Sequence, residues 1–183
     1  DGTVNLSSGT LAFNSAPVLD GQFNWTGGTL QFDAAFSLTN TNVPKLLGLD
    51  ATLNAGQTLT SSAGIPMTIL TPIVVSGGVL NPNSLINQSR LEVRLGSIGT
   101  LQNDGLLLGD GLISGQVTNS ATGKIRVETG KTLSFTGLFT ANAGELNLQG
   151  GTLDFSGEIT NSTNGSIAGR GALYAAGLTN NGT

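Results

Sequence analysis

The sequence predicts an all-β protein, a right-handed parallel β-helix (β-solenoid) of about nine turns with about 20 residues in each turn. Three observations predict this fold. A short phrase of the form Gly-Thr-Leu-x-Phe recurs along the chain, glycine accounts for 28 of the 183 residues, and no segment combines an apolar helical stripe with helix-capping signals. A unit of about 20 residues cannot bury its apolar side alone, so the turns must stack on one another.

The first phrase predicts one strand in each turn. Its clearest copies are Gly9–Phe13, Gly28–Phe32, Gly130–Phe135 and Gly151–Phe155. Thr-Leu-x-Phe alternates, so Leu and Phe point to one side of the strand and Thr points to the other. We expect the inward side chains to form a stacked core that contains Leu11, Phe13, Leu30, Phe32, Leu59, Leu80, Leu101, Leu133, Phe135, Leu153, Phe155 and Leu173.

The spacing of the central leucines predicts the number of turns. Weaker copies of the phrase begin at Gly56, Gly77, Gly99 and Gly171. Most successive leucines lie about 20 residues apart, and two gaps, from Leu30 to Leu59 and from Leu101 to Leu133, are about half as long again. If the excess of these two gaps contains one further degenerate copy, the leucines divide the chain into eight steps, and hence nine turns. Right-handed coiling is expected because crossovers between parallel strands of one sheet are right-handed in nearly all proteins.

A second phrase, an aliphatic residue followed by Thr-Asn, predicts a further strand and its corner. It occurs at Val117–Asn119, Ile159–Asn161 and Leu178–Asn180, with relatives at Leu38–Asn40 and Leu101–Asn103. Corner asparagines accept hydrogen bonds from the backbone or stack in ladders between turns. The alternative for some asparagines is glycosylation, because Asn-x-Ser/Thr sequons occur at Asn5, Asn24, Asn87, Asn161, Asn164 and Asn181.

We interpret residues 1–183 as a single solenoid domain in which residues 43–75 form an atypical insertion. This segment contains three prolines and the only methionine of the chain. Since proline cannot donate a hydrogen bond to a sheet, the segment is expected to bulge from a turn, form an edge or contact a lateral partner.

The composition restricts the chemistry of the protein. Cysteine and histidine are absent, which excludes disulfides and thiol nucleophiles and removes the commonest metal ligand, so we expect no cofactor and no metal. With seven Lys and Arg against eleven Asp and Glu, no nucleic-acid partner is expected. The longest apolar stretch, Ile65–Val75, is short and contains prolines, so the chain is not expected to span a membrane.

The remaining candidate sites are weak. The carboxylates are scattered, so we do not expect an enzyme, although Arg126, Glu128, Lys131 and Asp154 would form a surface cluster if they lie on neighbouring turns. Trp25 and Tyr174 are the candidates for stacking against a sugar. Thr10, Thr29, Thr58, Thr132 and Thr152 recur once per turn, which gives one file of threonines where an ice-binding face would need two.

The repeats resemble a known group of surface proteins. Segments such as GGTLDF, ITNSTNGSI and GRGALYAAGLTNNGT are similar to the repeats of bacterial haemagglutinin-like adhesins and autotransporter passenger domains. This resemblance implies a secreted, extracellular right-handed β-helix that serves as a stalk, fibre or adhesive surface. An adhesin segment that binds glycans or a host surface is therefore the closest alternative to a structural fibre, and a polysaccharide-acting β-helix enzyme is a distant one.

The two ends of the sequence match the repeat pattern in phase. Gly2–Phe13 (GTVNLSSGTLAF) aligns with Gly144–Phe155 (GELNLQGGTLDF) without a gap. Joining the end of the sequence to its start places Leu11 of the following copy about 20 residues after Leu173, which is the ordinary length of a turn. We therefore expect another solenoid turn to stack on each end, either from a second copy bound head to tail or from a tandem array.

Overall fold

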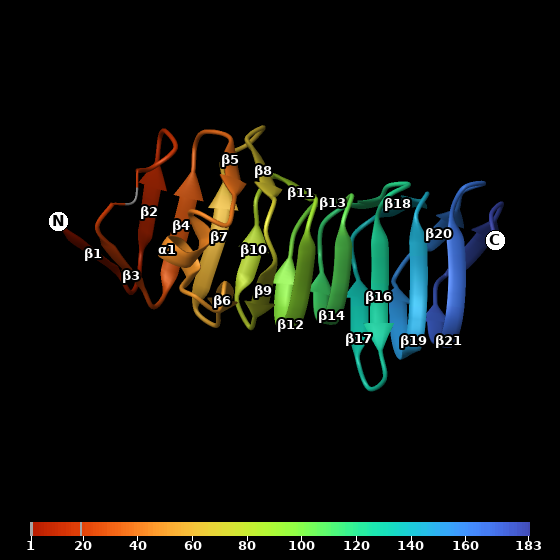
Figure 1. The fold of residues 1–183 in the computed structure, drawn as a ribbon. Helices are drawn as coiled ribbons and strands as arrows, with labels where there is room; N and C mark the ends of the chain where they lie inside the picture. Colours follow the sequence, from red (N-terminus) through yellow and green to blue (C-terminus); the bar gives the residue numbers. More distant parts are fainter. Residues whose placement is uncertain (1, 19) are drawn as a thin grey trace.

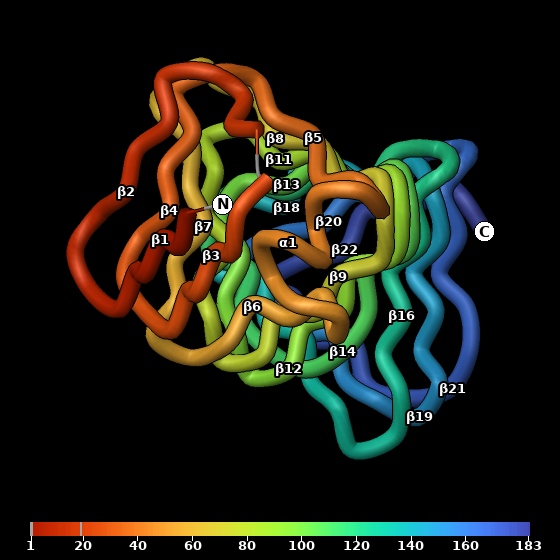
Figure 2. The backbone as a smooth tube through the Cα atoms, turned by 60° about the vertical axis from the view of Figure 1, so that its left-hand side comes forward, coloured from red at the N-terminus to blue at the C-terminus, as the bar shows by residue number. Residues whose placement is uncertain are grey.

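The computed structural model describes residues 2–18 and 20–183 as an elongated right-handed β-solenoid (Figure 1). Viewed from the N-terminal end, the chain coils clockwise as it recedes (Figure 2). Every pairing between named strands is parallel, and nine successive turns stack along the axis. We number the turns 1 to 9, starting with the turn that contains β1. Each complete turn contributes strands to three faces.

Face 1 is formed by the first strand of each turn. It consists of β1 (Thr3–Leu6), β3 (Gln22–Trp25), β6 (Thr52–Asn54), β9 (Ile73–Ser76), β16 (Lys124–Glu128) and the first parts of β12 (Arg90–Ile98), β14 (Leu106–Ile113), β19 (Glu145–Phe155) and β21 (Ser166–Tyr174). The four long strands bend across the corner into face 2, so turns 5, 6, 8 and 9 have no loop there.

Faces 2 and 3 complete the cross-section. Face 2 consists of β2 (Thr10–Phe13), β4 (Gly28–Phe32), β7 (Gln57–Ser61), β10 (Val79–Asn81), β17 (Thr132–Phe135) and the second parts of β12, β14, β19 and β21. Face 3 consists of β5 (Phe36–Leu38), β8 (Pro66–Ile69), β11 (Ser84–Asn87), β13 (Leu101–Asn103), β15 (Val117–Asn119), β18 (Phe139–Asn142), β20 (Glu158–Asn161) and β22 (Gly177–Asn180). The second sequence phrase therefore forms face 3.

Most of the expected core residues are buried. Nine of the twelve are no more than 3% exposed. Leu11, Phe13 and Leu173 are only partly buried, because they belong to the first and last turns and have a neighbouring turn on one side only. The central turns bury their apolar side chains from both sides, and this stacked burial is the main source of stability in the rod.

The core leucines do not form one continuous file, which corrects the expected register. Leu30, Leu59 and Leu80 pair in succession, but the next partner of Leu80 is Ile98, and that file continues to Phe135. Leu133 pairs instead with Gly111 and then with Leu153. The cause is two short turns: Asn87, Asn103 and Asn119 are equivalent residues only 16 positions apart. As a result, the Leu of the N-terminal phrases aligns with the Phe of the C-terminal ones.

Three further expectations change with this register. Leu101 is buried on face 3, where it pairs with Leu85 and Val117. The phenylalanines form two separate clusters: the ring centroids of Phe13 and Phe32 lie 5.6 Å apart, and those of Phe135 and Phe155 lie 4.6 Å apart. The threonines also separate into one file of three, Thr10, Thr29 and Thr58, and one pair, Thr132 and Thr152.

The atypical segment is shorter than expected. Its irregular part is the helix α1 (Val43–Leu47), which has Pro44 in its first turn and packs against β3. β3 pairs with β1 alone, so α1 interrupts face 1 between β3 and β6. The helix also explains the long gap between Leu30 and Leu59. Part of the aliphatic run is ordinary core, since Met67, Ile69, Ile73 and Val75 are at most 1% exposed, whereas Leu70 in the same run is 49% exposed.

Leu95 occupies a corner position that favours glycine. Its φ is 56° and its side chain is 81% exposed, whereas the corresponding corners of other turns contain Gly77 and Gly130 at φ 71° and 74°. A left-handed conformation costs a non-glycine residue about 1–2 kcal/mol. Glycine avoids this strain, but it loses more conformational entropy on folding, and that loss offsets about half of the gain. We expect Leu95→Gly to raise the free energy of unfolding by about 0.5–1 kcal/mol in urea titrations.

Leu138 provides the matched control. It is 64% exposed, and its φ is not positive. Leu138→Gly should therefore lower the free energy of unfolding, and equal destabilisation by both substitutions would show that Leu95 is not strained.

Candidate functional site

The C-terminal end of the solenoid exposes positions that are core positions elsewhere. In the last turn, Leu178 is 52% exposed and Leu173 is only partly buried. One turn earlier, the residues that pair with Leu173 and Leu178, Leu153 and Ile159, are 0% and 2% exposed. The outer edges of β21 and β22 pair with no other strand in the described chain, and only the start of β21 is covered, where the Ile167 amide donates to the Thr183 carbonyl oxygen at 2.7 Å. We call this surface the C-terminal end surface.

The N-terminal end contains an apolar hollow. Its volume is about 340 Å³, and Val4, Leu11, Phe13 and Phe23 are among the side chains that line it. Leu11, Phe13 and Phe23 are partly buried and pack on the core from one side, and Val4 is 49% exposed. This surface, the N-terminal end surface, also presents the unpaired outer edges of β1 and β2. Each end of the rod therefore presents apolar side chains and the unpaired outer edges of its last strands. The two end surfaces face in opposite directions along the rod axis.

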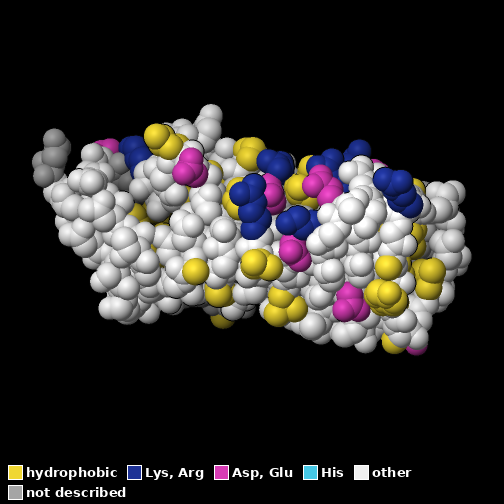
Figure 3. All heavy atoms as spheres, turned by 90° about the horizontal axis from the view of Figure 1, so that it is seen from below, with side chains coloured by type: hydrophobic (Ala, Val, Ile, Leu, Met, Phe, Trp, Pro, Cys, Tyr) yellow, Lys and Arg dark blue, Asp and Glu magenta, His cyan; other side chains and the backbone are white. Residues whose placement is uncertain are grey.

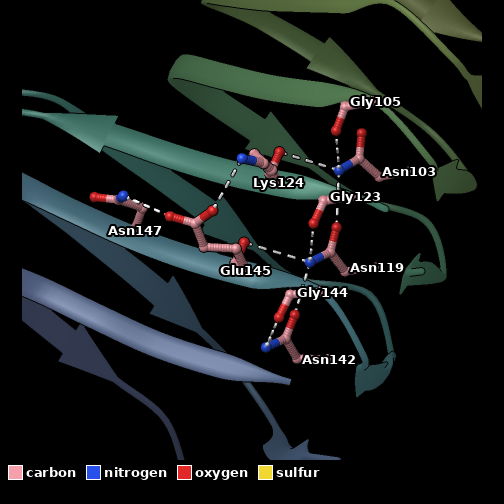
Figure 4. Close-up of polar contacts among 9 residues, drawn as sticks. All are labelled: Asn103, Gly105, Asn119, Gly123, Lys124, Asn142, Gly144, Glu145 and Asn147. Carbon is pink, nitrogen blue, oxygen red and sulfur yellow. Dashed lines mark hydrogen bonds and ion pairs between the residues drawn. The ribbon is translucent and has the colours of Figure 1, made fainter. Parts of the chain in front are cut away.

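A ladder of buried asparagines runs along the corner after face 3. Asn87, Asn103, Asn119, Asn142 and Asn161 are at most 1% exposed, and each side-chain amide donates to the side-chain oxygen of the next asparagine at 2.7–2.8 Å, ending at Asn180. Figure 4 shows the central members of this ladder.

Each ladder amide also satisfies backbone carbonyls at the corner. The Nδ2 of Asn103 lies 3.2 Å from the Gly105 oxygen and 3.1 Å from the Lys124 oxygen, and the Nδ2 of Asn119 contacts the carbonyls of Gly123 and Glu145. The bonds all point from the N-terminal to the C-terminal side. Asn180 accepts the last bond, and its own amide donates to no group within the described residues.

The sequons have two kinds of environment. Asn87 and Asn161 are completely buried in the ladder, where they stack with the corner asparagines of the neighbouring turns. Asn5 and Asn24 are exposed on face 1 and pair with each other at 2.9 Å. Asn164 and Asn181 are exposed at corners.

The two candidate sugar-stacking residues also differ. Trp25 is only 7% exposed and lies in the core beside Phe23, with ring centroids 6.4 Å apart, so its ring is not available to a sugar. Tyr174 is exposed on the last strand of face 2.

The charged residues of the expected cluster do not all meet. Asp154 is exposed on face 2, next to Ser134, whereas Arg126 and Glu128 lie on face 1 and form an ion pair at 3.2 Å. Among residues 2–18 and 20–183, no group of three metal-ligating side chains comes together. No helix in this part of the chain is long and apolar enough to cross a membrane.

Comparisons with protein families, characterised proteins and solved structures find no match to this chain. The two end surfaces, where apolar side chains lie without a neighbouring turn, are the candidate functional site.

Proposed function

We propose that this chain is a structural unit of an extracellular bacterial fibre in which solenoids stack end to end. The observation that carries the proposal is the pair of end surfaces, which leave Leu11 and Phe13 at one end and Leu173 and Leu178 at the other without a covering turn. An apolar end with unpaired strand edges is a template for another β-chain. Because the two surfaces differ, such a contact is heterologous and extends into filaments.

The sequence supplies the register of the proposed joint. Gly2–Phe13 aligns with Gly144–Phe155, and the second of these segments stacks directly on β21, with Thr152 opposite Ala172 and Leu153 opposite Leu173. If β2 of a second copy takes the equivalent place beyond the second part of β21, Thr10 lies opposite Ala172 and Leu11 lies opposite Leu173. Gly182 and Thr183, which lie against Gly165 and Ile167 at the start of β21, must then move aside for Gly2 and Thr3 of the second copy. The apolar side chains of both end surfaces then become buried.

The extracellular location rests on the repeats' resemblance to bacterial surface proteins and on a composition suited to an exposed fibre. Charged residues make up only 10% of the chain, which reduces repulsion between stacked units. A glycan-binding adhesin segment is the second candidate function, and the observation that favours it is the charged part of face 1 described below.

Single substitutions at the end surface test the proposal. We expect electron microscopy of the purified protein to show rods longer than one unit and sedimentation to show association that increases with concentration. Leu178→Lys should leave only single units, because it places a charge in the joint.

Leu138→Lys is the matched control, since Leu138 is also exposed, at 64%, but lies in turn 7, away from both end surfaces. It should leave the rods intact. The proposal would be contradicted if the unmodified protein stays a single unit at every concentration, or if Leu178→Lys and Leu138→Lys abolish the rods equally.

A further inference from the structure

Face 1 concentrates the positive charge of an otherwise acidic protein. Six of the seven Lys and Arg residues lie on it or at its border with face 2, with four carboxylates among them, so this region carries a net charge of +2 while the rest of the chain carries −6. These residues, the basic patch, are Arg90, Glu92, Arg94, Asp110, Lys124, Arg126, Glu128, Lys131, Glu145 and Arg170. Figure 3 shows Lys and Arg gathered with Asp and Glu on one side of the rod, toward its C-terminal half.

The ion pairs of the basic patch leave cationic groups accessible. The Glu92 carboxylate is shared by Arg90 at 2.5 Å and Arg94 at 2.6 Å, and these two arginine side chains are 48% and 57% exposed. The hydrogen bond from Arg94 lowers the pKa of Glu92 despite partial burial, so Glu92 is ionised at neutral pH and the trio has a net charge of +1. Each guanidinium has five N–H donors, most of which remain free for a ligand.

Two further cations carry no ion pair within the described residues. Lys131 and Arg170 are both exposed. Lys131 lies at the corner between β16 and β17, and its charge is among the causes that lower the pKa of Glu92. Arg170 pairs with Gln149 on the neighbouring strand. The trio of Arg90, Glu92 and Arg94 therefore contributes +3 together with Lys131 and Arg170, and Asp110 reduces the net charge of the patch to +2.

The cations recur along the axis with a period of two turns. Arg90 and Arg94 lie in turn 5, Lys124 and Arg126 in turn 7, and Arg170 in turn 9. At a strand spacing of about 4.8 Å, these positions are about 10 Å apart. The pattern matches a ligand that is extended along the rod and carries a repeated negative charge.

We propose that the basic patch binds an acidic polysaccharide, a chain of sugars with carboxylate groups, laid along the rod axis. The patch offers arginine forks for carboxylates and, beside them, the amides of Asn147 and Gln149 for sugar hydroxyls. Duplex DNA fits less well because it carries one charge per about 1.7 Å of axis, which would press phosphates against Glu92 and Glu145.

Binding to polygalacturonate at low salt, measured by isothermal titration calorimetry with dextran and duplex DNA in parallel, tests the proposal. We expect polygalacturonate to bind, with an affinity that falls as salt increases, and dextran not to bind. The double variant Lys131→Gln/Arg170→Gln removes only unpaired cations and should weaken binding about fivefold to tenfold.

Lys45→Gln is the matched control, because Lys45 is the one cation outside the patch. Its affinity should equal that of the unmodified protein, and circular dichroism establishes that each variant is folded. The proposal is overturned if polygalacturonate does not bind, if Lys45→Gln weakens binding as much as the double variant, or if DNA binds more tightly than polygalacturonate.

Discussion

Replacing Asn119 by alanine is expected to lower the free energy of unfolding by about 3 kcal/mol. Asn119 is 0% exposed in the middle of the ladder, where it accepts from Asn103 at 2.8 Å and donates to Asn142 at 2.7 Å. Its loss removes both bonds and leaves the buried side-chain oxygen of Asn142 without a donor. Urea unfolding followed by circular dichroism measures the change.

Two variants test whether the ladder is responsible. Asn164→Ala, at an exposed corner, should change the stability by less than about 0.5 kcal/mol. Asn119→Asp keeps a hydrogen-bond acceptor but loses the donor and buries a charge. At neutral pH it should therefore lower the free energy of unfolding more than Asn119→Ala does. Burial raises the pKa of such a carboxyl above the unfolded value, so part of the loss should be recovered as the pH falls toward about 3.9. Similar stabilities for Asn119→Ala and Asn164→Ala would contradict the ladder's role.

Gly109→Ala is expected to lower the free energy of unfolding by at least about 4 kcal/mol, or to prevent folding altogether. Gly109 is at φ 123°, where a Cβ atom would lie 1.9 Å from the carbonyl oxygen of Val93 in the preceding turn. That oxygen belongs to backbone between two paired turns, so the clash can be relieved only by separating them.

Gly130→Ala separates this clash from backbone strain. Gly130 is also left-handed, at φ 74°, but a Cβ atom there would meet nothing within 4 Å. Gly130→Ala should therefore lower the free energy of unfolding by only about 1–2 kcal/mol. If Gly109→Ala and Gly130→Ala reduce the unfolding midpoint equally, the close stacking of turns 5 and 6 described here is wrong.

Much of the fold follows from the local alternation of the sequence. Thr-Leu-x-Phe specifies a strand with one apolar side, and the aliphatic-Thr-Asn phrase specifies both a strand of face 3 and, at Asn103, Asn119, Asn161 and Asn180, its ladder corner. The register between turns could not be predicted in the same way. It depends on the lengths of the corners, and the two short turns on either side of Asn103 shift the later leucines onto a different file.

The helix and most of the basic patch were also beyond sequence reasoning, which brought together only Arg126, Glu128 and Lys131 of the patch. Val43–Leu47 is only five residues long, too short for a recognisable helical period, and its buried Val43, Leu46 and Leu47 resemble the aliphatic residues of a strand. The patch unites residues between Arg90 and Arg170 that are far apart in the sequence. Their common face becomes visible only when each strand is placed in its turn.

Disulfide cross-linking across the proposed joint tests end-to-end stacking most directly, because the chain contains no cysteine of its own. Cα atoms of facing residues on paired strands lie about 4.8 Å apart, within the range of a disulfide, and a two-residue shift separates them by more than about 7 Å. The double variant Thr10→Cys/Ala172→Cys should form a ladder of dimers, trimers and longer species under mild oxidation, whereas each single variant should stop at a dimer. The account is contradicted if the double variant forms no species longer than a dimer.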